Sequence, residues 1–157
     1  MAPMAIIISP VLTAGQLLCR VRVNLTHNPQ QALDATGRKQ RNINPSALDS
    51  MPRGEGDERD VIFFKPNRFM TGFELKSVYE SLRLYPADPY SLCGANESDP
   101  IFADQHPNLT IWEKLDGKQC YVAFHNRYCN IHVVDVGVME SYDKSLDCHW
   151  WYAGISR

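Results

Sequence analysis

Apolar and polar residues follow two different periods along the chain. Between residues 70 and 84, apolar residues recur at the three- and four-residue spacing of an amphipathic helix. Thr71 and Glu74 have the spacing of a capping box, in which each side chain accepts the other residue's backbone N–H. The pattern predicts a helix that Thr71 caps and that Pro86 ends. Its apolar stripe consists of Leu75, Val78, Tyr79 and Leu82.

Period-two alternation predicts strands on both sides of this helix. Residues 17–24 alternate cleanly, and residues 61–64 form a continuous apolar run that is typical of a strand buried on both faces. After residue 109 the period stays at two, and Asp116-Gly117 is a strong signal for a hairpin turn. The strands expected in this last part of the chain are 110–115, 118–125, 130–138 and 148–155.

Short helices are expected where proline follows a capping residue. Asn28-Pro29, Asn44-Pro45 and Asp88-Pro89 each have this form, and Asp99-Pro100 should open one further turn. We therefore predict an α+β fold with a largely antiparallel sheet of about five or six strands, covered by one main helix and several short helices. The 157 residues fit a single globular domain spanning 1–157.

Composition is ordinary for a soluble protein, with 44% hydrophobic and 22% charged residues. No run approaches the roughly 18 apolar residues of a membrane span, so we expect no membrane partner. The apolar start of the chain has no basic residue before it and Pro10 interrupts it, which argues against a signal peptide. Five cysteines make an odd count without the spacing of a disulfide scaffold, which favours reduced thiols and a cytoplasmic location.

Positive charge is concentrated near the start of the chain although the formal net charge is −2. Residues 1–56 hold six Lys/Arg against three Asp/Glu. This asymmetry allows an accessory nucleic-acid-binding function as one alternative. The overall acidity and the lack of interleaved aromatic residues argue against it. The residues that would bind phosphates are Arg20, Arg22, Arg38, Lys39 and Arg41.

Aromatic residues gather in the last third of the chain. In an extended strand, Trp150 and Tyr152 share one face while Trp151 takes the other. Tryptophan and tyrosine offer large contact areas at low entropic cost. We therefore favour a small non-enzymatic protein-interaction or binding domain, with a protein as partner and no cofactor. Its predicted binding residues are Trp150, Trp151, Trp112 and Tyr128.

Cysteine and histidine suggest a third alternative, a metal-binding or small hydrolytic domain. Strand parity argues against a shared site, because residues an odd number of positions apart face opposite ways. A nucleophilic site could pair Cys120 or Cys129 with His125 or His132, and Asp135 would orient the histidine. The possible metal ligands are Cys120, Cys129, His132 and Cys148.

Four segments resemble a set of uncharacterised small proteins of reduced-genome bacteria. The resemblance implies a bacterial or phage origin and a cytoplasmic setting, and it implies no activity or ligand. The segments are residues 29–40, 51–56, 86–92 and 151–157.

Overall fold

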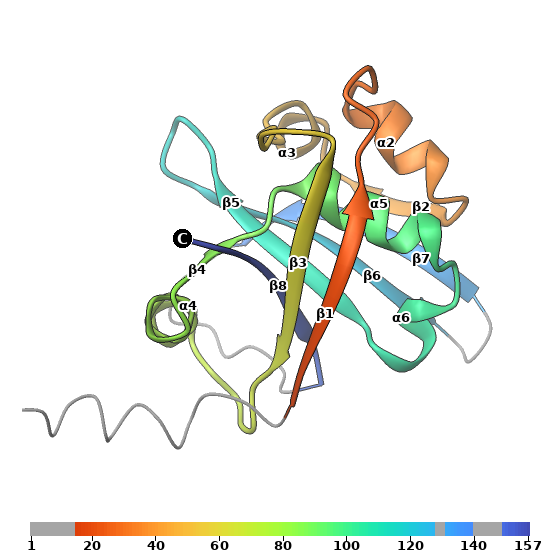
Figure 1. Ribbon diagram of the computed structural model, residues 1–157. Helices are drawn as coiled ribbons and strands as arrows, with labels where there is room; N and C mark the ends of the chain where they lie inside the picture. The colour runs from red at the N-terminus through yellow and green to blue at the C-terminus, as the bar shows by residue number, and fades with distance from the viewer. Residues whose placement is uncertain (1–14, 128–130, 140–148) are drawn as a thin grey trace, which may run out of the picture.

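The computed structural model describes residues 15–127, 131–139 and 149–157. Within them, an eight-stranded sheet and five helices form an α+β fold, which confirms the predicted class (Figure 1). In chain order the elements are β1 (Gly15–Arg22), α2 (Pro29–Ala35), β2 (Lys39–Ile43), α3 (Pro45–Asp49), β3 (Glu58–Lys65), α4 (Gly72–Ser81), β4 (Leu84–Pro86), α5 (Pro89–Ser98), α6 (Phe102–Gln105), β5 (Asn108–Glu113), β6 (Gln119–Arg127), β7 (Ile131–Val138) and β8 (Trp151–Ser156).

The sheet is mixed, with strand order β1–β3–β8–β5–β6–β7–β2 and β4 paired to β8. β5 runs parallel to β8 and β2 runs parallel to β7, whereas the other pairs are antiparallel. The prediction of five or six strands is therefore wrong, since the sheet has eight. The prediction of a largely antiparallel sheet omits the two parallel pairs. Both parallel pairs join strands that are distant in sequence, and no hairpin signal reveals such pairs.

Two strands were not expected. β2 starts inside the basic tract at Lys39 and lacks apolar alternation, so the hydrophobic pattern gives no sign of it. β4 is three residues long and occupies the stretch expected to finish the preceding helix. Helix α4 ends at Ser81, well before Pro86, because Arg83 takes a left-handed φ of 56° that redirects the chain toward β8.

Helix starts follow the predicted caps. Thr71 Oγ1 accepts the Glu74 N–H at 3.2 Å, and Glu74 Oε1 accepts the Thr71 N–H at 3.2 Å. Side chains of Asn28, Asn44 and Asp88 cap α2, α3 and α5. The expectation of one main helix is wrong, since α4 and α5 are each ten residues long.

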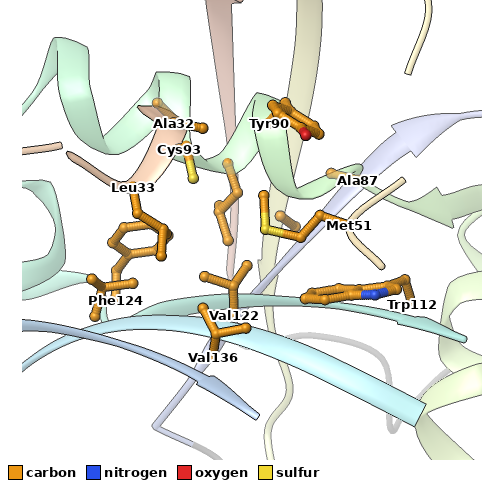
Figure 2. Packing of buried hydrophobic residues seen from close by; sticks show 14 of the residues in the cluster. Ala32, Leu33, Met51, Ala87, Tyr90, Cys93, Trp112, Val122, Phe124 and Val136 are labelled. Carbon is orange, nitrogen blue, oxygen red and sulfur yellow. The ribbon is translucent and has the colours of Figure 1, made fainter. Parts of the chain in front are cut away.

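The two faces of the sheet carry separate cores. The larger core lies between the sheet and helices α2, α3 and α5, and includes Leu33, Trp112 and Phe124 (Figure 2). The smaller core lies under α4, which is set apart from the other long helices (Figure 1). Among the described residues, none from β2 or β7 belongs to the smaller core. These two strands therefore present their α4-side face beyond the area that α4 covers.

A buried ion pair joins β3 to the start of α5. Arg59 Nη1 lies 2.7 Å from Asp88 Oδ2, and the two side chains are 7% and 6% exposed. The same nitrogen donates to Ser91 Oγ at 2.9 Å. Asp88 also accepts the Ser91 N–H as the α5 cap, so one carboxylate serves both the helix and the guanidinium.

Replacing Arg59 by leucine should lower the free energy of unfolding by about 3–5 kcal/mol, because it leaves the Asp88 carboxylate buried without its counter-charge. Adding Asp88→Asn should restore part of this loss, since asparagine still caps α5 and carries no charge. Urea denaturation of both variants measures the effect. The control is Arg20→Leu, which breaks an exposed ion pair and should cost much less. Equal losses from Arg59→Leu and Arg20→Leu would contradict the prediction.

Candidate functional site

A groove of about 300 Å³ lies where β2, β7 and β6 pair. Lys39 on β2 faces Val133 on β7, and Arg127 on β6 faces Ile131 on β7. Residues paired across neighbouring strands share a face of the sheet, so these side chains meet on one side. The groove is lined by Lys39, Arg41, Arg127, Ile131 and Val133, and we call these residues the cationic groove.

The three cations of the cationic groove have no ion-pair partner among the described residues. Three other surface arginines differ in this respect. Arg20 pairs with Asp60 at 3.0 Å, Arg22 with Glu58 at 2.6 Å and Arg68 with Glu74 at 2.5 Å. The groove therefore gathers three positive charges that no described carboxylate neutralises.

Arg38 lies on the other side of β2 and is buried, although it precedes Lys39 directly. Its guanidinium donates to Asn126 Oδ1 at 3.0 Å. It also donates to three backbone carbonyls at 2.9–3.1 Å, those of Val133, Pro100 and His125. Burial lowers the pKa of Arg38, and the charge of Asp104 opposes that shift. The side chain is thus occupied in fixing β2 to β6 and β7 and is unavailable to a phosphate.

The five basic residues named from the sequence therefore do not form one surface. Arg20 and Arg22 lie on β1, at the opposite end of the strand order from β2, and face Asp60 and Glu58 of β3. Lys39 and Arg41 line the cationic groove, and Arg38 does not. Arg127 was not among the residues predicted from the sequence. Its position two residues after His125 on the same strand places both side chains on one face, which is the signal that the sequence offers.

Next to the cationic groove, His125 Nε2 lies 2.8 Å from Asp135 Oδ2. The ring of Trp150 lies 5.4 Å from the His125 ring at 76°. The second carboxylate oxygen, Asp135 Oδ1, is buried without a hydrogen-bond partner. Asp135 lies between the β7 residues that face Gln40 and Ile43, which makes it the carboxylate closest in register to Arg41. Asp135 Oδ2 is bonded to His125, and no ion pair joins Asp135 to Arg41 among the described residues.

Asp135 was predicted from the sequence to orient a histidine, and it is bonded to His125. Among the described residues, no cysteine lies beside this pair. Cys120 lies in the larger core on the opposite face of β6 from His125. Burial raises the pKa of the Cys120 thiol, which keeps it protonated. Cys129 lies outside the described residues.

Tyr121 shares the face of His125, four residue pairs along β6. Its ring lies across Gly137 of β7, where an added Cβ would be 2.8 Å from the phenol oxygen. Burial, followed by the charge of Asp135, raises the pKa of Tyr121. The phenol therefore keeps its proton at neutral pH.

The proposed metal ligands are not assembled within the described part of the chain. Cys120 faces Val138 and His132 faces Asn126, six residue pairs apart. At about 3.3 Å per residue they are about 20 Å apart. His132 Nδ1 instead lies 3.0 Å from Asp104 Oδ1. No group of three or more His, Cys, Asp or Glu suited to a metal occurs in the described residues, and Cys129 and Cys148 lie outside them.

The aromatic residues named from the sequence separate between the two faces. Trp112 is buried in the larger core, where its Nε1 donates to Ser50 Oγ at 2.9 Å (Figure 2). Trp151 packs against the same core and its ring lies 5.0 Å from that of His106. Trp150 takes the other face beside His125, as the strand parity predicts. Tyr128 lies outside the described residues.

Comparison with protein-family models, curated proteins and solved structures gives no match. In the part of the chain that the structure describes, no helix is both long and apolar enough to cross a membrane. The resemblance to small proteins of reduced-genome bacteria stays a prediction. The geometry of the site therefore provides the basis for a functional proposal.

Replacing Arg38 by methionine should lower the free energy of unfolding by about 2–5 kcal/mol, because three carbonyl oxygens in the interior lose their donor. The matched control is Lys39→Met at the next position, which faces the groove and should change stability by less than about 0.5 kcal/mol. Urea denaturation compares the two. Similar midpoints for both variants would show that Arg38 does not fix β2.

Proposed function

We propose that the protein is a non-enzymatic binding domain whose cationic groove binds an anionic macromolecule. The observation that supports this proposal is the gathering of Lys39, Arg41 and Arg127 without a described ion-pair partner. Guanidinium groups bind phosphates and carboxylates through paired hydrogen bonds, and a lysine adds a point charge. A groove lined by one sign of charge also concentrates oppositely charged partners.

The acidity of the whole chain is compatible with this proposal. The formal net charge of −2 acts over the whole molecule, whereas the screening length at physiological salt is about 8 Å. A ligand inside the groove therefore interacts chiefly with the nearby cations. We expect affinity that falls as salt concentration rises.

A protein partner bound through the C-terminal aromatic residues is the second candidate. Trp150 supports it, since its side chain is partly exposed on the face that carries the groove. Trp112 and Trp151 give it less support because they pack against the larger core. An acidic protein segment would also fit the cationic groove, and the tests below distinguish it from nucleic acid.

Charge reversal of the groove should weaken binding to a simple polyanion. The variant Lys39→Glu/Arg41→Glu should bind inorganic polyphosphate at least about tenfold more weakly than the unchanged protein. The matched control, Arg20→Glu/Arg22→Glu, makes the same change in net charge on β1 and should retain most of the affinity. Fluorescence anisotropy with labelled polyphosphate measures both.

Circular dichroism and the urea midpoint should first show that both double variants are folded. Equal weakening in both variants would mean that total charge alone governs binding. Unchanged binding in Lys39→Glu/Arg41→Glu would show that the cationic groove is not the anion site.

A further inference from the structure

The α4-side face places an aromatic pair beside the cationic groove. His125 precedes Arg127 by two residues on β6, so both side chains lie on this face. His125 faces Val133 on β7, and Val133 faces Lys39 on β2. Because neighbouring strands lie about 4.8 Å apart, this row spans about 10 Å from the imidazole to the lysine. Trp150 extends the row at the end away from Lys39.

The His125 ring is held from two sides. Asp135 Oδ2 forms a hydrogen bond with His125 Nε2 at 2.8 Å. The Trp150 ring packs against the His125 ring at an interplanar angle of 76°. Rings that are already fixed lose little conformational freedom when a ligand packs on them. The pair of His125 and Trp150 therefore has the chemistry of a preorganised aromatic contact for a planar group.

We infer that the cationic groove and the His125–Trp150 pair together bind single-stranded nucleic acid, an inference that rests on the proposed anion-binding function. Lys39, Arg41 and Arg127 contact phosphates, and a base packs against the aromatic pair. Sheet surfaces that bind single strands combine these two features, because every base has a π-face and every nucleotide a phosphate. Stacked nucleotides advance about 3.4 Å along a strand, so about three of them span the row.

The composition of the groove floor favours a nucleotide chain. Ile131, which is 39% exposed, provides aliphatic surface beside the cations. This surface suits the apolar edge of a sugar or a base, while the flanking cations hold the phosphates. An acidic polypeptide would use the cations but would have no particular need for the aromatic pair. A base-paired duplex keeps its bases stacked inside, away from Trp150.

The test compares four anionic ligands on the full chain, of which the dT and abasic strands carry equal charge. Fluorescence anisotropy would measure binding of a labelled dT 12-mer, an abasic 12-mer with the same phosphates, a 12-base-pair duplex and polyglutamate. The dT 12-mer should bind about five- to a hundredfold more tightly than the abasic strand, which is the range for one stacked base. Its log affinity should fall with log salt at a slope of about −2, as expected for three phosphate contacts.

Variants then assign the base contact. Trp150→Leu should remove the difference between the dT and abasic strands and leave binding of polyphosphate unchanged. Trp150→Phe keeps an aromatic ring and should retain a preference for the dT strand. If Trp150→Leu does not fold, the comparison of the two strands on the unchanged protein still decides the inference, and Trp150→Phe still reports on the ring.

Each failure has a distinct meaning. Equal affinity of the unchanged protein for the dT and abasic strands would overturn the inference and leave the anion-binding proposal standing. Tighter binding of the duplex or of polyglutamate than of the dT strand, compared per negative charge, would also overturn it and would identify that class of partner instead. A lack of binding to any strand and to polyphosphate would overturn both proposals.

Discussion

The buried guanidinium of Arg38 joins the parts of the structure that form the candidate site. It donates to backbone carbonyls on β6 and β7 and to one in the turn before α6, and it lies immediately before β2. β2 is a short edge strand with a bulge, and its parallel pairing to β7 provides little hydrophobic contact of its own. Because Arg38 points inward, Lys39 is set on the opposite side of β2, facing the groove. One buried cation thus positions its exposed neighbours.

Strand parity divides the molecule into a face for packing and a face for binding. Along β6, Cys120, Val122 and Phe124 enter the larger core, while Tyr121 and His125 lie on the α4 side. Helix α4 covers one part of that second face, and β7 and β2 extend beyond the core under it. The cationic groove lies at this extension.

Local signals predicted the elements well and their arrangement poorly. The capping box of Thr71 and Glu74 and the proline at the start of α5 depend on neighbouring residues, so the sequence shows them directly. The parallel pairing of β2 with β7 joins residues about ninety positions apart and has no local signature. β2 also lacks apolar alternation because its stability comes from Arg38 and from β7. Lys39 and Arg41 were therefore predicted from the sequence without Arg127, which lines the same groove.

Two similar basic stretches differ because their neighbouring strands differ. Arg20 and Arg22 on β1 and Lys39 and Arg41 on β2 each alternate along an edge strand. β3 sets Asp60 and Glu58 directly opposite the first pair, so those charges are neutralised. β7 sets Val133 opposite Lys39, and the carboxylate nearest Arg41 in register, Asp135, is bonded to His125. The neighbouring strand therefore determines which of these cations have an ion-pair partner among the described residues.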